Sequence, residues 1–360
     1  MVYLKCIYTK NFGDDLLISI LCNRYKKHKF ITVNNHKETD FNLCDNLDVI
    51  YYNNFLFTLV RRISNIIFKK RCYLETRIIK KCEYVIVIGG SIFMETKNYT
   101  KYNRYSLWYQ NLNKPYFIIG SNIGPVYTSE YIDEIKSNIL NNARDVCLRD
   151  KKSYLYVKDM DNVRVSTDIV FSYDVSKYKN IKQNKKVLIS VIDVDTKKAQ
   201  IKNPDSNNYR KKIIELIKKF DGLGYKVELI SLCKSEGDEN IINSIIDDIV
   251  DEVNVKKFFY DGNIDETINE FASSEIIIGT RFHANILGML LNKVVIPIIY
   301  NDKTKNLLKD INFNGKVMDI NKLERFNVDA LNSDDFNYRC NIEKQILESN
   351  KHFEVIDKYL

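Results

Sequence analysis

One stretch of the sequence places groups that can bind an anion and move a proton directly after an apolar run. Residues 275–285 read Glu-Ile-Ile-Ile-Gly-Thr-Arg-Phe-His-Ala-Asn, which predicts a buried strand, a Gly-Thr turn and the start of a helix. A helix N-terminus presents backbone N–H groups to anions, and a guanidinium can bind phosphate or carboxylate through two hydrogen bonds. A histidine titrates near neutral pH. We therefore expect Thr280 and Arg281 to bind an anion and His283 to act as general acid or base. The alternative is a solvated arginine and a structural histidine.

A second candidate loop follows the first predicted strand and has the sequence Asn-Phe-Gly-Asp-Asp from Asn11. Gly13 permits a tight turn, while Asn11 and Asp14 could contact a ligand or only cap the helix that follows. The loop lacks the GxGxxG fingerprint of dinucleotide-binding folds, so no nicotinamide cofactor is indicated.

Small residues follow two further apolar strands. One strand runs into Gly89, Gly90 and Ser91, and the next runs into a Gly-Ser-Asn turn that contains Ser121 and Asn122. Such turns let a ligand approach the backbone closely, and three of them at strand ends would form the rim of a binding cleft. Arg149 stands at another strand end, before Asp150, and a simple surface ion pair is the alternative there.

Apolar runs alternate with helical patterns along the whole chain, which indicates βαβ units and parallel sheets. We expect strands at residues 2–9, 30–33, 84–88, 115–120, 145–149 and 163–170, and again at 187–194, 226–232, 255–260, 275–279 and 294–300. The fold class is therefore α/β, with two Rossmann-like domains and a ligand cleft between them. The predicted domains are residues 1–175 and 186–330, joined by a polar linker, with a helical tail at 331–360 that packs back on the first domain.

Composition excludes several classes of protein. The 360 residues are 45% hydrophobic and 28% charged, which is a globular balance. The net charge of +8 favours anionic partners, but it is spread along the chain without a nucleic-acid-reading motif. Eight cysteines without a CxxC pair indicate reduced residues of a cytoplasmic protein, and no cluster has metal-ligand spacing. Residues 53–71 are apolar and basic, as in a helix resting on an anionic membrane surface or in an amphipathic core helix.

Taken in order, these motifs resemble the polysaccharide pyruvyl transferase family. The segments that carry the likeness are NFGDD, VIGGSIF, GSNIGP, CLRDKKS, STDIVF and GTRFHANILGMLLNKVVIPIIYNDK, and they span most of the chain. The resemblance implies a fold similar to the GT-B type of glycosyltransferase. It also implies transfer of pyruvate from phosphoenolpyruvate, as co-substrate, to a sugar of a surface polysaccharide or of its lipid-linked precursor, with neither cofactor nor metal.

The resemblance also implies roles for individual residues. The family's Arg-Leu-His motif falls on Arg281, Phe282 and His283, and its Arg-Asp-x-x-Ser segment begins at Arg149. Arg149, Arg281 and Thr280 are then expected to bind the donor. His283, and more weakly Asp14, are expected to transfer protons. The acceptor is assigned to a set of loop residues: Asn11, Gly13, Gly90, Ser91, Ser121 and Asn122. Two alternatives stay open, a GT-B glycosyltransferase that uses a nucleotide sugar and a non-catalytic sugar-binding protein.

Overall fold

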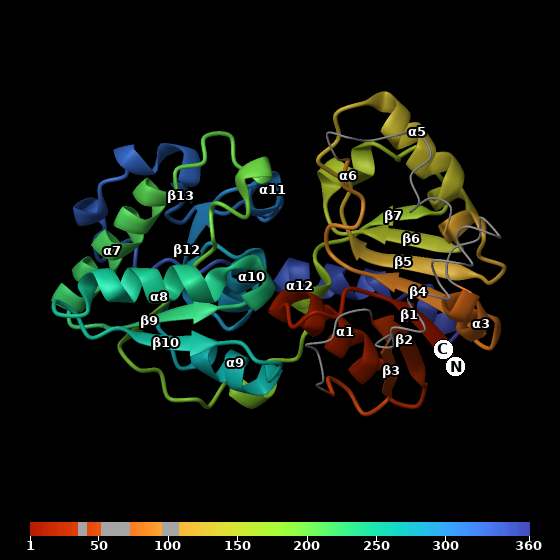
Figure 1. Ribbon diagram of the computed structural model, residues 1–360, viewed down its shortest axis with the longest axis horizontal. Coiled ribbons are helices and arrows are strands. Elements are labelled where there is room, and N and C mark those ends of the chain that lie inside the picture. Colours follow the sequence, from red (N-terminus) through yellow and green to blue (C-terminus); the bar gives the residue numbers. More distant parts are fainter. Residues whose placement is uncertain (35–41, 52–72, 96–107) are drawn as a thin grey trace. The chain divides into compact units, whose positions relative to one another are not determined.

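The computed structural model of the protein describes residues 1–34, 42–51, 73–95 and 108–360. The chain forms two compact units, each a sheet flanked by helices (Figure 1). The first unit comprises Met1–Thr9, Asp14–Ser172 and Leu347–Leu360. The second comprises Lys10–Gly13 and Tyr173–Ile346.

The first unit is built on a seven-stranded sheet with the order β3-β2-β1-β4-β5-β6-β7, and all of its strand pairs are parallel. The strands are β1 (Val2–Lys5), β2 (Phe30–Asn34), β3 (Leu47–Tyr51), β4 (Tyr84–Ile88), β5 (Tyr116–Ser121), β6 (Asp145–Leu148) and β7 (Val163–Val165). Strands β4 and β5 are continuous apolar runs because helices cover both faces of a parallel sheet. From β1 the strand order proceeds to one edge through β2 and β3 and to the other edge through β4 to β7. The strand order therefore reverses between β1 and β4, and doubly wound folds bind ligands at such a reversal.

The helices of the first unit include α1 (Phe12–Arg24), α3 (Tyr73–Lys80), α5 (Ser129–Asn138) and α6 (Lys151–Leu155). Helix α5 shows why these segments are helical. Its N-cap Thr128 accepts a hydrogen bond from the Tyr131 N–H, and Tyr131, Ile132 and Ile135 bury one face of the helix. These side chains join the apolar cluster that lies on the sheet.

The second unit repeats the plan with a six-stranded sheet in the order β10-β9-β8-β11-β12-β13, again parallel throughout. Its strands are β8 (Lys186–Ser190), β9 (Lys226–Ser231), β10 (Lys256–Phe259), β11 (Ile276–Gly279), β12 (Val294–Ile299) and β13 (Met318–Asp319). Its helices are α7 (Ser206–Gly222), α8 (Asp238–Ile249), α9 (Ile264–Ala272), α10 (Phe282–Leu290) and α11 (Asp302–Asp310), and α12 (Glu343–Ser349) leads back to the first unit. In this sheet the strand order reverses between β8 and β11.

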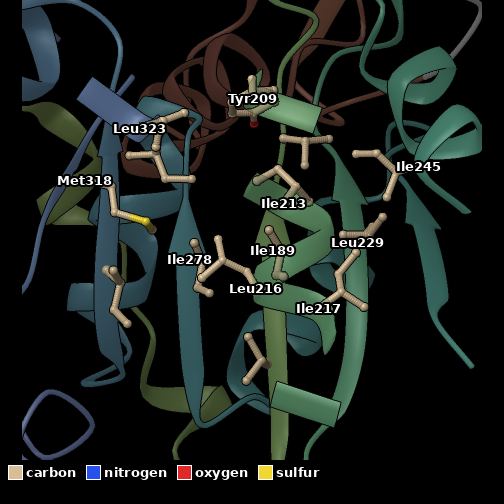
Figure 2. Close-up of a cluster of buried hydrophobic side chains, with 14 of the residues drawn as sticks. Ile189, Tyr209, Ile213, Leu216, Ile217, Leu229, Ile245, Ile278, Met318 and Leu323 are labelled. Atoms are coloured by element: carbon tan, nitrogen blue, oxygen red, sulfur yellow. The ribbon is translucent and has the colours of Figure 1, made fainter. Parts of the chain in front are cut away.

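The core of the second unit lies between helix α7 and the sheet (Figure 2). Ile213, Leu216 and Ile217 of α7 face Ile189 of β8 and Ile278 of β11, and all five side chains are fully buried. Burying each such side chain contributes about 1.5–3 kcal/mol to folding. The packing holds the carboxyl ends of β8, β9 and β11 at fixed positions, so the loops that follow them begin from a rigid base.

Short 3₁₀ helices complete the connections. They are η1 (Leu140–Asn142), η2 (Ile169–Ser172), η3 (Ser176–Tyr178), η4 (Lys198–Gln200), η5 (Lys234–Glu236), η6 (Ile320–Arg325), η7 (Val328–Ala330), η8 (Asn350–His352) and η9 (Ile356–Lys358). Within the described residues, no helix combines the length and apolar character needed to cross a membrane.

The division between the units differs from the predicted one at three places. The predicted linker belongs to the second unit, where Tyr178 is buried and its hydroxyl donates to Asp265 at 2.7 Å. The tail splits, because residues up to Ile346 lie with the second unit and only Leu347–Leu360 lie with the first. The segment Lys10–Gly13 also belongs to the second unit, since Phe12 is fully buried there.

The last fourteen residues, Leu347–Leu360, are held in the first unit by buried polar and apolar contacts. His352 is fully buried, and its Nε2 donates to the Thr167 carbonyl at 2.7 Å while its Nδ1 accepts from the Gly120 N–H at 3.4 Å. Burial, which disfavours the charged imidazolium, lowers the pKa of His352 to about 4. This histidine is therefore a neutral structural residue.

Candidate functional site

The turn between β11 and α10 is anchored by buried hydrogen bonds. The Thr280 N–H donates to the Ser190 carbonyl at 3.0 Å, and the Thr280 hydroxyl lies 2.9 Å from the Tyr209 hydroxyl. All three residues are fully buried. Gly279 is required because a Cβ there would lie 2.2 Å from Oδ1 of Asn285. Thr280 thus positions the turn through its contacts with β8 and α7.

Arg281 is the N-cap residue of α10, and its guanidinium binds two carboxylates of the loop after β9. Its Nε donates to Asp238 Oδ2 at 2.9 Å and its Nη2 to Asp238 Oδ1, while its Nη1 donates to Glu236. Glu236 also binds Nζ of Lys197 at 2.6 Å. The charges of these four side chains cancel. In this structure, Arg281 therefore has carboxylate partners at the positions where an anionic ligand was expected.

The ion pairs shift the acidity of these groups strongly. Burial alone would raise the pKa of Glu236, but Arg281 and Lys197 outweigh it and lower the pKa to about 2. Burial likewise opposes the charge of Arg281, yet Asp238 and Glu236 hold its pKa well above the ordinary value. Both groups are therefore charged at neutral pH.

His283 lies in the first turn of α10 and packs against the loop from the start of the chain. A Cβ added to Gly13 would lie 1.9 Å from His283 Nδ1, so only glycine leaves room for the imidazole. Next to it, Asn11 forms a β-bridge with Cys233, and the Phe12 N–H donates to the Leu232 carbonyl at 3.0 Å. The loop is thereby fixed beside the histidine within the second unit.

The remaining predicted residues, apart from Asp14, form a cluster at the carboxyl ends of β4, β5 and β6 in the first unit. Arg149 is buried, and its guanidinium donates to Asp168 at 3.0 Å and to Asn122 Oδ1 at 2.7 Å. Ser91 donates to the same oxygen of Asn122 at 3.0 Å, and a Cβ on Gly90 would lie 2.9 Å from Arg149 Nη1. The loops and the arginine therefore support one another directly.

Ser121 links the same loops through its side chain and backbone. Its hydroxyl donates to the Gly89 carbonyl at 2.9 Å, and its carbonyl accepts from the Arg149 N–H at 3.0 Å. The hydroxyl is fully buried and serves the loop conformation. Among the predicted acceptor residues of this unit, Ser91 and Asn122 join the cluster through side-chain hydrogen bonds, and Gly90 through its close approach to Arg149.

The cluster around Arg149 and the cluster around Arg281 each combine residues predicted to bind the donor with residues predicted to bind the acceptor. Arg149, expected at the donor, lies with Gly90, Ser91, Ser121 and Asn122, which were expected at the acceptor. Asn11 and Gly13, also expected at the acceptor, lie with Thr280, Arg281 and His283. Asp14 belongs to the first unit, where it is one of two acidic residues in the first turn of α1.

Three charged residues of the cluster around Arg281 were not predicted from the sequence: Lys197, Glu236 and Asp238. Asp238 offered a weak signal, since it follows Gly237 and opens the helix that comes after strand β9 and a short turn. Lys197 and Glu236 offered none, because their pairing joins loops about forty residues apart.

No group of three or more metal-ligating side chains occurs in the described part of the chain. The cysteines described there are all free thiols, namely Cys6, Cys22, Cys44, Cys82, Cys147, Cys233 and Cys340. The predicted membrane-contacting stretch at 53–71 lies outside the described residues.

Several solved structures share the fold along almost the whole chain. HepE of Anabaena, in complex with UDP and glucose, has a TM-score of 0.55 at 9% identity and covers 99% of this chain and 96% of its own. UDP-GlcNAc 2-epimerase of Neisseria meningitidis has a TM-score of 0.55 at 14% identity, and coverage is 100% and 99%. The Methanocaldococcus jannaschii epimerase gives 0.54, at 11% identity, with coverage of 100% and 99%. The predicted GT-B-like fold of two Rossmann-like domains is confirmed.

The sequence itself identifies the family. Residues 11–302 match the profile of the polysaccharide pyruvyl transferases, and this span holds both clusters, from Asn11 to His283. The order of the motifs and the positions of Arg149, Arg281 and His283 at strand carboxyl ends agree with this match. The chain belongs to the polysaccharide pyruvyl transferase family.

Proposed function

We propose that this protein transfers pyruvate from phosphoenolpyruvate to a sugar of a surface polysaccharide or of its lipid-linked precursor. The observation that carries the proposal is the family match over residues 11–302. The arginine and histidine of its motif lie at the reversal between β8 and β11 of the second sheet. Ligands of open α/β sheets bind at such reversals.

The reaction defines what the protein must supply. The methylene carbon of phosphoenolpyruvate gains a proton, and two sugar hydroxyls add in turn to the central carbon. The bond from that carbon to the phosphate oxygen breaks. The hydroxyls lose two protons, of which one offsets the proton added to carbon and the other leaves with the phosphate. The products are a methyl-bearing cyclic ketal and inorganic phosphate.

His283 is assigned the proton transfers, because an imidazole can both donate and accept a proton near neutral pH. Its place beside Gly13 supports the role, since the contact fixes the ring in one orientation. Asp14 is the second candidate for deprotonating a sugar hydroxyl.

Arg281 is assigned to the anionic groups of the donor, together with Thr280 through the turn that it anchors. Arg149 is assigned to the donor as well. Asn11, Gly13, Gly90, Ser91, Ser121 and Asn122 remain proposed acceptor residues, and cytoplasmic localisation with peripheral contact at the inner membrane surface remains part of the proposal.

The direct test is incubation of the purified protein with phosphoenolpyruvate and a panel of galactose, glucose and N-acetylmannosamine glycosides. We expect acceptor-dependent release of phosphate and a new ketal methyl signal by NMR, lost in His283→Ala and in Arg281→Ala. Gly222→Ala is the matched control, because a Cβ there meets no atom within 4 Å. Absence of the methyl signal with every acceptor would count against the proposal.

A nucleotide-sugar glycosyltransferase is the second candidate, and the likeness to HepE, solved with UDP and glucose, favours it. Thermal stabilisation separates the two candidates. Stabilisation by phosphoenolpyruvate supports pyruvyl transfer, whereas stabilisation by UDP alone supports the glycosyltransferase. A non-catalytic sugar-binding protein would bind a glycoside without turnover of either donor.

A further inference from the structure

Two cations of the second unit converge on one carboxylate. Lys197 Nζ lies 2.6 Å from Glu236 Oε1, and Arg281 Nη1 donates to Glu236 Oε2. The side chains of Lys197 and Arg281 are each 10% exposed, whereas that of Glu236 is 31% exposed. The carboxylate is thus the most accessible member of the group and covers two cations from the solvent side.

The three residues come from loops that follow neighbouring strands. Lys197 follows β8, Glu236 lies in η5 after β9, and Arg281 follows β11. These strands are adjacent and parallel, in the order β9-β8-β11, so their carboxyl ends share one edge of the sheet. The cations therefore meet where a doubly wound sheet binds its ligands.

Arg281 has one fixed and one exchangeable edge. Its Nε and Nη2 bind Asp238, which is fully buried and also accepts from the N–H groups of Leu232 and Cys233 at 3.2 and 3.1 Å. Removing that carboxylate would leave a buried charge without its partner, which is costly. Nη1 instead binds the partly exposed Glu236, whose side chain can turn toward water.

The backbone that carries Glu236 is anchored independently of its carboxylate. The Thr196 hydroxyl donates to the Glu236 carbonyl at 3.0 Å. Gly237 follows with φ +87°, and a Cβ there would lie 2.6 Å from Asp193 Oδ2. The loops after β8 and β9 therefore keep their positions when the carboxylate moves.

We propose that Lys197 and Arg281 bind the phosphate group of the substrate and that Glu236 occupies this site until the phosphate displaces it. The inference rests on the proposed function, since the phosphate is that of phosphoenolpyruvate. A phosphate offers several acceptor oxygens, so it can take the Nη1 hydrogen bond and the ammonium contact together. Lys197 is thereby a substrate-binding residue, and Asp238 is a positioning residue for Arg281.

The test measures equilibrium binding of inorganic phosphate, and then of phosphoenolpyruvate, by calorimetry in a phosphate-free buffer. Glu236→Gln removes an internal competitor, so we expect phosphate to bind about tenfold more tightly. Lys197→Met should weaken binding at least about tenfold, because one of the two cations is lost. Glu252→Gln is the matched control, since Glu252 pairs with Lys218 at an exposed position.

Unchanged or weaker phosphate binding in a folded Glu236→Gln protein would overturn the inference, and so would unchanged binding in Lys197→Met. Lys197→Arg keeps the charge and should retain binding, which separates loss of a ligand contact from loss of the fold. Turnover distinguishes the two proposals. If phosphate binds as described but no ketal forms, pyruvyl transfer fails and the phosphate site stands. If the ketal forms with an unchanged KM for phosphoenolpyruvate in Lys197→Met, the phosphate site fails and pyruvyl transfer stands.

Discussion

Each arginine of the two clusters is held by a buried aspartate from a neighbouring loop. Arg149 binds Asp168 in the first unit, and Arg281 binds Asp238 in the second. In both pairs the aspartate is buried. A guanidinium fixed in this way is already oriented when a ligand arrives. It can therefore stabilise charge that develops in the transition state without reorganisation of the site.

Gly13→Ala tests whether the contact with His283 positions the imidazole. The added methyl group would lie 1.9 Å from Nδ1, so the ring must move. A displacement of about 1 Å can reduce turnover about 100-fold. Assays of phosphate release should show the loss mainly in kcat, and Gly222→Ala should retain full activity. Wild-type kcat in Gly13→Ala would show that the ring position is not needed.

Asp168→Ala tests the buried ion pair of the first unit. The side chains of Arg149 and Asp168 are only 3% and 2% exposed, so loss of the aspartate should destabilise the protein by about 3–5 kcal/mol. Chemical denaturation measures the change. Asp159→Ala is the control, since Asp159 pairs with Lys136 at the surface, and we expect it to leave the unfolding curve unchanged. Equal effects of the two substitutions would contradict the argument.

The single loops were predictable at the residue level, but the contacts between them were not. Arg281 and His283 stood out because they follow an apolar run at a helix start. Lys197 and Glu236 did not, because a charged residue in one loop carries no sign of the charge it meets in another. The grouping of Arg149 with Asn122 likewise depends on the strand order, which local patterns do not contain.

At the scale of elements, most strands were predicted, whereas the edge strands β3 and β13 were not. Strands β5, β8 and β11 are buried throughout and β4 is buried after its first residue, and the prediction of all four is confirmed. Strand β3 was missed because only its first residue is buried, and β13 because it has two residues. The tail was expected to be helical, but α12 covers only Glu343–Ser349 before short 3₁₀ turns.

The docking of the tail should make stability depend on pH. The folded protein keeps His352 neutral down to a pKa of about 4, whereas the unfolded chain takes up the proton near 6.5. The unfolded state thus binds more protons between these values. The contribution of His352 to the free energy of unfolding is complete above about pH 6.5. It is lost as the pH falls toward 4, and the total loss is about 3 kcal/mol.

Thermal unfolding of the wild type and of His352→Gln across this window checks the expectation. The substitution should flatten the dependence on pH, because glutamine does not titrate and can still donate to the Thr167 carbonyl. The same slope in both proteins would mean that other groups cause it.

At the scale of the whole molecule, Phe12 stabilises a unit far from it in sequence. Its ring packs edge-on against Tyr260 at 5.4 Å and parallel to Phe271 at 6.3 Å, measured between ring centroids. Phe12→Ala should cost about 3–5 kcal/mol, and the cost should fall on the second unit.

Hydrogen exchange localises the effect. Amides around Tyr260 and in α9 should exchange faster in Phe12→Ala, while those of β4 and β5 keep their rates. Phe30→Ala is the matched control, because Phe30 is fully buried in β2 of the first unit and should show the opposite pattern. Faster exchange of the β4 and β5 amides in Phe12→Ala would show that Phe12 stabilises the first unit, contrary to this prediction.

The division of the chain also determines the order in which the two units can be finished during synthesis. The ribosome makes Leu347–Leu360 after the whole of Tyr173–Ile346, yet the first unit needs that segment to cover the backbone around Gly120 and Thr167. The nascent first unit therefore stays incomplete, with an apolar surface exposed, while the second unit is translated. The second unit contains the early segment Lys10–Gly13 and has all of its residues once Ile346 is made, before the first unit has all of its own.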